Sequence, residues 1–279
     1  MAGTMTNPAT APVPAPSRRH DVGQLTQLGR VLSSEWSKLR TVRSTMWTLI
    51  ATLVVCIGLP ALFSLAIINQ PRSDIGPDFD GASFSLFGVF LGQLIVGALG
   101  VLVITAEYST GTIRATLSAT PQRLVMLLAK TVTFAVVIAV VSYVTVFAAF
   151  FAVQAILNTH DLGVTLGEGN STRMVIGGGL YLIIVGLLGL GVGTILRHSA
   201  AGISTVLGLL FVLPILASFL PQSWQEHVVK YLPGQAGQAI FQHGADNNTL
   251  APWTGLAFFA GYALLSLLVG AFMLKRRDA

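Results

Sequence analysis

The chain has 279 residues, of which 53% are apolar and only 10% are charged, and its formal net charge is +5. An average soluble domain has about 25% charged residues, so this composition excludes a soluble enzyme and a disordered protein. The single cysteine, Cys56, excludes an internal disulfide. The length suits about six membrane spans of roughly 20 residues each, joined by short connections.

The N-terminal part differs from the rest of the chain. Residues 1–23 are rich in Ala, Pro and Thr and contain no apolar core, so we expect a disordered cytoplasmic tail and no signal peptide. Residues 24–41 repeat apolar side chains at helical spacing and predict an amphipathic helix in the inner headgroup layer. The side chains expected to meet that layer and its anionic lipids are Trp36, Lys38, Arg40, Arg43 and Trp47. A cytosolic helix that caps the bundle is the alternative.

Six later stretches contain no Asp, Glu, Lys or Arg and are long enough to cross a membrane as helices. They cover approximately residues 45–68, 84–106, 131–157, 175–196, 200–220 and 252–274. Their apolar runs are continuous, whereas strands of a membrane barrel would alternate. We therefore expect an all-α membrane protein with six transmembrane helices, formed by one transmembrane domain over residues 24–279.

Two connections and one polar residue within a span stand out. The loop from Glu107 to Arg123 predicts a short helix over 112–119, followed by an N-cap at Thr120 and the next helix, although an ordinary connecting loop is the alternative. Residues 221–251 predict two short helices that dip toward the outer leaflet, or a surface loop. Gln93 lies near mid-membrane and either lines a pathway or bonds a neighbouring helix.

Two pairs of glycines allow close helix packing: Gly88 with Gly92, and Gly189 with Gly193.

The basic residues predict the orientation. With the N-terminus in the cytoplasm, the inner segments contain 13 of the 16 basic residues but only four of the 11 acidic residues. Both termini are then cytoplasmic. The net positive charge comes mainly from basic residues at the cytoplasmic ends of the spans. It therefore reflects membrane orientation and does not indicate a nucleic-acid partner.

Several catalytic motifs are missing from the sequence. It has no GxxxxGK[ST] phosphate loop, no HExxH zinc motif and no GxSxG nucleophile motif. We therefore expect no enzyme activity, no catalytic residues and no metal site in this chain, and the scattered histidines are expected to be solvated. The spans also lack the charged groups that ion-coupled carriers use. A cytoplasmic partner that acts on the inner loops would have to supply the energy for any transport.

Together these features resemble the permease subunit of an ABC-2 family exporter, most closely the actinobacterial type. Three stretches carry the resemblance. Glu35–Trp47 (EWSKLRTVRSTMW) is similar to the family's start of the first span, Glu107–Arg114 (EYSTGTIR) to its segment after the second, and Ala129–Lys130 to the start of the third. The motifs are short and degenerate, but their combination covers nearly the whole chain.

The resemblance implies an elbow helix at 24–41, a coupling helix at 112–119 and outer re-entrant helices at 221–251. The residues that it assigns to coupling with the ATPase are Glu107, Gly111, Thr112 and Arg114. It also implies a second permease subunit, in a homodimer or heterodimer, and a separate ATP-binding subunit that binds ATP and Mg²⁺. The chain itself would hold no cofactor and would export an unidentified substrate across a bacterial plasma membrane. A membrane scaffold or immunity protein that sequesters a membrane-active peptide would have the same topology and is the alternative.

Overall fold

The computed structural model describes residues 24–76, 79–113, 123–242 and 249–276, and every regular element within these ranges is a helix. The α-helices are α1 (Gln24–Thr41), α2 (Arg43–Ile68), α3 (Gly81–Ser85), α4 (Phe87–Ser109), α6 (Arg123–Leu157), α7 (Ser171–Leu196), α8 (Ser199–Leu207), α9 (Leu213–Ala217), α10 (Gln222–His227), α11 (Pro233–Gln238) and α12 (Pro252–Arg276). The short turns are η1 (Arg72–Asp74), η2 (Asn158–His160), the π-helical η3 (Gly208–Val212), η4 (Val229–Tyr231) and η5 (Ala239–Phe241).

The number of membrane spans agrees with the sequence prediction. Six helical stretches of the described chain are long and apolar enough to cross a membrane, and they are Arg43–Ile68, Gly81–Ser109, Arg123–His160, Ser171–Leu196, Ser199–Ala217 and Pro252–Arg276. This confirms the expected all-α membrane fold with six transmembrane helices. The predicted cap at Thr120 and residues 1–23 lie outside the described residues.

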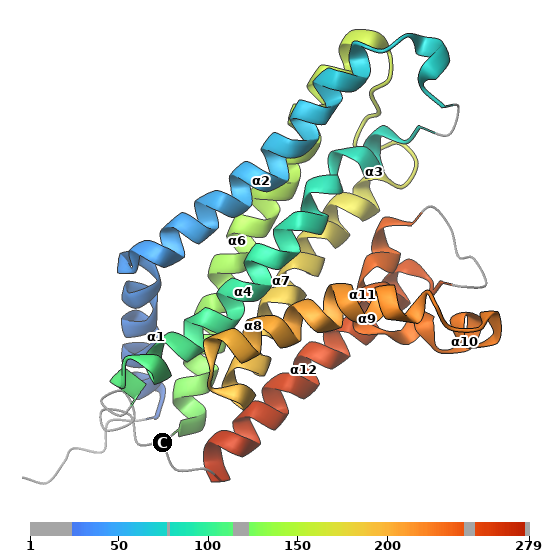
Figure 1. The fold of residues 1–279 in the computed structure, drawn as a ribbon. Coiled ribbons are helices and arrows are strands. Elements are labelled where there is room, and N and C mark those ends of the chain that lie inside the picture. Colours follow the sequence, from blue (N-terminus) through green and yellow to red (C-terminus); the bar gives the residue numbers. More distant parts are fainter. Residues whose placement is uncertain (1–23, 77–78, 114–122, 243–248, 277–279) are drawn as a thin grey trace, which may run out of the picture.

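Helix α7 forms the centre of the bundle, and α4, α6, α8 and α12 pack around it (Figure 1). The share of buried residues in its apolar part is the highest among the six spans. Large side chains fill the space around it. Fully buried examples are Phe134 and Phe150 of α6, Tyr181 of α7 and Phe259 of α12.

Both glycine pairs lie at close helix contacts, as predicted. A Cβ atom added to Gly88 or Gly92 of α4 would collide with Cys56 of α2. A Cβ atom added to Gly189 of α7 would collide with the backbone oxygen of Gly97 in α4. Small residues let these backbones approach one another, which supplies the van der Waals contact that holds helices together in lipid.

The two ends of the bundle are built differently. Helix α1 bends away from the axis of α2 and lies at the same end as the last turn of α4, the first turn of α6 and the last turn of α12 (Figure 1). We call this the α1 end. There the Arg123 guanidinium donates a hydrogen bond of 3.1 Å to the carbonyl oxygen of Leu274, which ties α6 to α12.

The opposite end contains α3, η2 and the segment from α10 to η5. The amide nitrogen of Gln154 donates hydrogen bonds of 2.9 Å to Ser85 Oγ and to the carbonyl oxygen of Gly81. Its amide oxygen accepts a bond of 2.8 Å from the backbone N–H of Val164. One buried amide therefore joins α3, α6 and the loop before α7.

The segment after the fifth span forms the short helices α10 and α11, as its sequence predicted. Helix α11 begins at Pro233, whose fixed φ suits the first helical position. Gly234 lies against the backbone of Leu210 in η3, and Gly237 lies against the ring of Phe259 in α12. This part of the segment is therefore packed into the protein, with its backbone covered.

Candidate functional site

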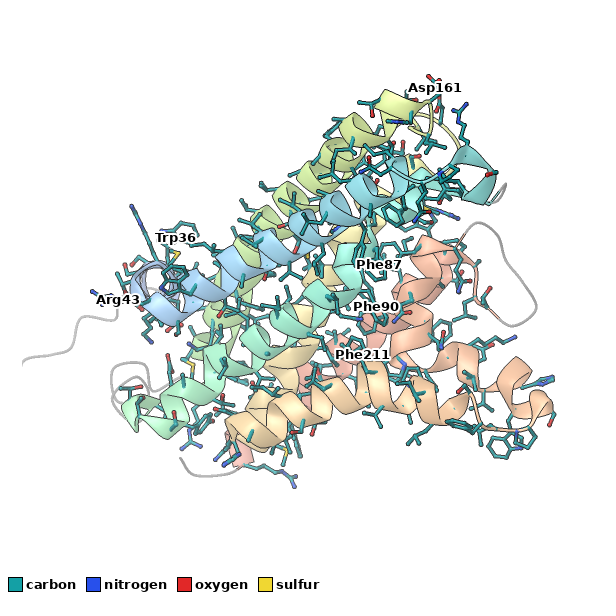
Figure 2. All side chains as sticks on the ribbon, turned by 45° about the horizontal axis from the view of Figure 1, so that its top comes forward. Trp36, Arg43, Phe87, Phe90, Asp161 and Phe211 are labelled. Carbon is teal, nitrogen blue, oxygen red and sulfur yellow. The ribbon has the colours of Figure 1, made fainter. Side chains whose placement is uncertain are left out.

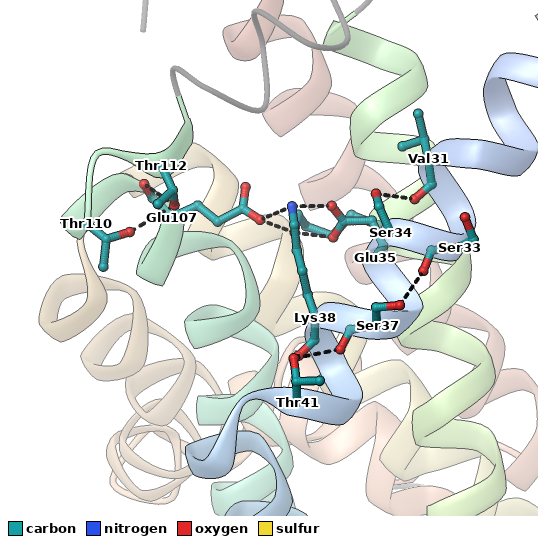
Figure 3. Close-up of polar contacts among 11 residues, drawn as sticks. Val31, Ser33, Ser34, Glu35, Ser37, Lys38, Thr41, Glu107, Thr110 and Thr112 are labelled. Atoms are coloured by element: carbon teal, nitrogen blue, oxygen red, sulfur yellow. Dashed lines mark hydrogen bonds and ion pairs between the residues drawn. The ribbon is translucent and has the colours of Figure 1, made fainter.

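Four charged side chains from three helices meet at the α1 end. We call Glu35 and Lys38 of α1, Glu107 of α4 and Lys130 of α6 the charge cluster. The Lys130 ammonium donates hydrogen bonds of 2.5 Å to Glu35 Oε2 and 2.9 Å to Glu107 Oε1. The Lys38 ammonium donates bonds of 2.6 Å to Glu35 Oε1 and 2.9 Å to Glu107 Oε1 (Figure 3). Each ammonium therefore bridges both carboxylates.

The charge cluster is largely removed from solvent. Glu35, Lys130 and Glu107 are only 2%, 3% and 8% exposed, whereas the side chain of Lys38 is 40% exposed. Two carboxylates and two ammonium groups make the cluster formally neutral. Burial of charges is costly unless they are paired and hydrogen-bonded, and this arrangement meets that condition. The cluster consequently fixes α1 against the ends of two transmembrane helices.

Lys38 forms the solvent-facing side of this cluster. Burial favours its neutral form and taken alone would lower its pKa, but the hydrogen bonds and charges of Glu35 and Glu107 outweigh burial. The pKa of Lys38 is therefore raised above its ordinary value, and the side chain stays charged at neutral pH. The sequence analysis predicted that Lys38 contacts anionic lipid, whereas in the structure its ammonium binds the carboxylates of Glu35 and Glu107.

One polar atom of the charge cluster has no hydrogen-bond partner among the described residues. This atom is Glu107 Oε2, which is buried. A buried carboxylate oxygen without a donor is unfavourable, so this atom is suited to accept a hydrogen bond from an internal water. Glu107 lies two residues before the end of α4, next to the loop to which the family resemblance gives a coupling role.

The loop after α4 begins with an anchored turn. Gly111 has a φ of +71°, a left-handed conformation that glycine adopts without strain, and it ends the helix. The hydroxyl groups of Thr110 and Thr112 lie 2.9 Å apart. Ile113 is only 4% exposed and belongs to a small apolar cluster. Its partners there are Met126, Leu127 and Leu274.

The structure places three of the four predicted coupling residues, Glu107, Gly111 and Thr112, at this turn. The backbone is helical again at Thr112 and Ile113, where the sequence predicted that a helix begins. Arg114 and the remainder of the predicted coupling helix lie outside the described residues. Sequence reasoning did not find the ion pairs of Glu35, Lys38 and Lys130. The available signal was that Lys130 stands as an isolated charge at the start of a long apolar run.

Gln93 lies away from the charge cluster and is fully buried. Its amide oxygen accepts a hydrogen bond from the hydroxyl group of Tyr181 in α7, and its amide nitrogen donates one of 2.9 Å to the carbonyl oxygen of Phe90. It therefore bonds a neighbouring helix, which was one of the two expectations from sequence.

The same residue also lines a cavity of about 360 Å³ between α4, α7 and the segment before residue 243. The lining residues are Ser83, Leu86, Phe87, Phe90, Gln93, Tyr181, Gln238, Phe241 and Gln242. A second hollow of about 280 Å³ adjoins it and shares Phe90 and Gln238 with it. The rings of Phe90 and Phe211 meet between α4 and η3 with their centroids 5.0 Å apart (Figure 2). Both linings combine aromatic rings with neutral polar side chains, and none of their described residues is Asp, Glu, His, Lys or Arg.

A comparison with known protein families identifies the family of this chain. The model described as "ABC-2 family transporter protein" matches residues 31–214, which is more than half of the chain. The matched range begins within α1 and includes the charge cluster, Gln93 and Tyr181. No curated protein matches the chain.

Proposed function

We propose that this chain, which belongs to the ABC-2 family of transporter proteins, is the membrane-spanning subunit of an ATP-driven exporter. Family membership makes it the permease component of an ABC transporter. Its partners in the proposal are a separate ATP-binding subunit and a second permease subunit. ATP and Mg²⁺ are bound by the ATP-binding subunit, because this sequence lacks a phosphate loop.

The observation that carries the proposal is the position of Glu107. Lys38 and Lys130 join it to α1 and α6, and the turn at Gly111 follows four residues later. At the far side of the loop, α6 begins at Arg123, which is tied to α12. A loop held at both ends by the bundle can pass a displacement to the helices instead of absorbing it. These contacts support a role for residues 107–123 in receiving force from an ATPase.

The proposed pathway runs through the cavity at Gln93. Its side chains offer aromatic surfaces together with the amide and hydroxyl groups of Gln93, Tyr181 and Gln238. Sites of this composition suit a substrate that is largely apolar but carries hydrogen-bonding groups. The second hollow extends the cavity along η3 and α9. Helix α11, the proposed outer re-entrant helix, lines one side of this hollow through Gln235 and Gln238.

The proposed orientation places the α1 end in the cytoplasm of a bacterial plasma membrane. The basic residues of α1, α6 and α12 support it, since cytoplasmic ends of membrane proteins are enriched in Lys and Arg. Reporter fusions after Lys275 are then cytoplasmic, and fusions near Gly167 are external. The reverse result would remove both the orientation and the assignment of residues 107–123 to an ATPase.

The decisive experiment is reconstitution with a cognate ATPase, which would be sought among the neighbouring genes. The purified chain alone should hydrolyse no ATP, and the pair should co-purify and hydrolyse ATP. Deletion of residues 112–119 should abolish co-purification while membrane insertion stays normal. Stable assembly without these residues would refute the coupling role. Absence of any ATPase partner would favour a scaffold or immunity protein.

A further inference from the structure

The junction of α1 and α2 presents two tryptophan–arginine pairs to the surroundings. Trp36 and Arg40 stand four residues apart on α1, and Arg43 and Trp47 stand four residues apart on α2, so each pair occupies one helix face. Only Val42 separates the two helices. Trp36 and Trp47 are 49% and 70% exposed, and both arginines are exposed. Figure 2 shows Trp36 and Arg43 at the same corner of the protein, pointing away from the bundle.

This corner has an excess of positive charge that the protein does not neutralise. Glu35 is the one acidic residue in the sequence of α1 and α2, and the charge cluster buries it. Among the described residues, no hydrogen bond or ion pair reaches the guanidinium group of Arg40 or Arg43. The formation of the charge cluster therefore leaves these two cations available to a ligand that is negatively charged.

An exposed apolar track leads away from the corner along α2. Met46, Ile50 and Val54 follow one another at intervals of four residues and are 37%, 46% and 63% exposed. Because α2 is a membrane-spanning helix, this track faces hydrocarbon chains when the protein is in a bilayer. A ligand at the corner consequently meets cations first, then indole rings, then an apolar strip.

We propose that this corner binds an anionic phospholipid. The Arg40 and Arg43 guanidinium groups bind its phosphate, since arginine matches the geometry of phosphate oxygens. Trp36 and Trp47 lie at the glycerol level, where indole rings are favoured, and the track on α2 receives an acyl chain. The order of these groups along one surface matches the order of groups in a phospholipid. The site requires neither the ATPase nor a particular substrate, so it goes beyond the transport role.

Tryptophan fluorescence provides the test. The chain has four tryptophans, and replacing Trp224 and Trp253 by Phe leaves Trp36 and Trp47 as the reporters. This full-length protein is placed in phosphatidylcholine bilayers that contain a small, equal fraction of either brominated phosphatidylglycerol or brominated phosphatidylcholine. Brominated phosphatidylglycerol should quench the emission more strongly. Inorganic phosphate should not reverse the difference, because the acyl chain is part of the ligand.

Variants separate a specific site from general surface charge. Arg40→Gln with Arg43→Gln should lower the preference for phosphatidylglycerol by roughly fivefold per arginine. Arg40→Lys with Arg43→Lys keeps both charges but loses the planar donor groups, so it should retain more of the preference than the Gln pair and less than the parent protein. Lys275→Gln with Arg276→Gln removes the same charge from the end of α12 and should leave the preference unchanged. Equal quenching by both lipids in the parent protein, or a preference unaffected by the Gln pair, would overturn the proposal.

Discussion

The ammonium of Lys130 lies 2.9 Å from Oε1 of Glu107, and this contact joins the start of α6 to the end of α4. The two residues stand at opposite sides of the loop over 107–123, which the proposed function assigns to an ATPase. The same ammonium also reaches Glu35 of α1. Three helices therefore meet at one buried lysine, and a displacement of the loop acts on all three.

Replacement of Lys130 by Met should destabilise the protein strongly. The change leaves Glu35 and Glu107 facing one another with half of their counter-charge removed, and breaking a buried ion pair in this way costs about 3–5 kcal/mol. Lys38→Met should cost less, since the Lys38 side chain is 40% exposed and that of Lys130 only 3%. Thermal unfolding in detergent measures both effects.

A second substitution checks that the loss comes from the charge. Adding Glu107→Gln to Lys130→Met removes one of the two carboxylates that would share the remaining ammonium of Lys38, and it should recover part of the lost stability. No recovery, or equal losses for the two lysine variants, would contradict the account of the charge cluster.

The contribution of Lys38 to stability should not change between pH 7 and pH 9. The pKa of Lys38 is raised above its ordinary value of 10.5 when the protein folds. Such a group contributes its full stabilisation below its pKa in the unfolded chain and loses it as the pH rises through the folded pKa. The difference in unfolding temperature between the parent protein and Lys38→Met should thus be constant over this range. A difference that vanishes by pH 9 would show that Lys38 is not held by the two carboxylates.

The sequence predicted the fold well because each transmembrane helix is a long apolar run, and its length and composition determine it locally. The bounds of α1 were predicted from the spacing of its apolar side chains. The close helix contacts at Gly88 and Gly189 were predicted because each of these residues has a second glycine four residues later. The charge cluster could not be predicted in this way. Glu35, Glu107 and Lys130 are far apart in the sequence, and only the packing of three helices brings them together.

The contacts of Gln93 at the candidate pathway also could not be predicted from the sequence. Its position near mid-membrane marked it in the sequence, but its partner Tyr181 could not be identified. The sequence contains five tyrosines, and nothing local distinguishes the one that faces α4. The cavity also depends on Gln238 of α11, and the sequence predicted a helix there without showing where that helix packs.

The hydrogen bond between Tyr181 and Gln93 should be required for transport. Tyr181→Phe leaves the buried amide oxygen of Gln93 without this donor, an effect worth about 1–3 kcal/mol, and Gln93→Leu removes the polar group from the cavity wall. Both variants should assemble with the ATPase but lose substrate-stimulated ATP turnover in vesicles. Tyr262→Phe is the matched control, because its hydroxyl bonds Tyr231 on the outside of α12. If all three variants retain the stimulation, the pathway does not pass Gln93.

Arg114→Glu should weaken assembly with the ATPase or uncouple ATP hydrolysis from export, with normal insertion into the membrane. Arg114 is the one charged residue in the sequence between Glu107 and Arg123, so we expect it to make the polar contact with the ATPase. Reversing a buried contact of this kind costs at least the loss of its pairing, about 2–5 kcal/mol, whereas a charge at the rim of an interface contributes much less. The measurements are co-purification, ATP turnover and export in vesicles.

The matched control for Arg114→Glu is Arg72→Glu. Arg72 lies at the opposite end of the bundle, where its guanidinium donates a hydrogen bond of 2.7 Å to the carbonyl oxygen of His160. The control makes the same change in charge at a surface that an ATPase at the α1 end does not reach, so assembly and turnover should stay normal. Should Arg114→Glu match the parent protein in assembly, turnover and export, Arg114 has no part in coupling. Thr112, which lies in the same loop and is exposed, would then be the next residue to test as the contact.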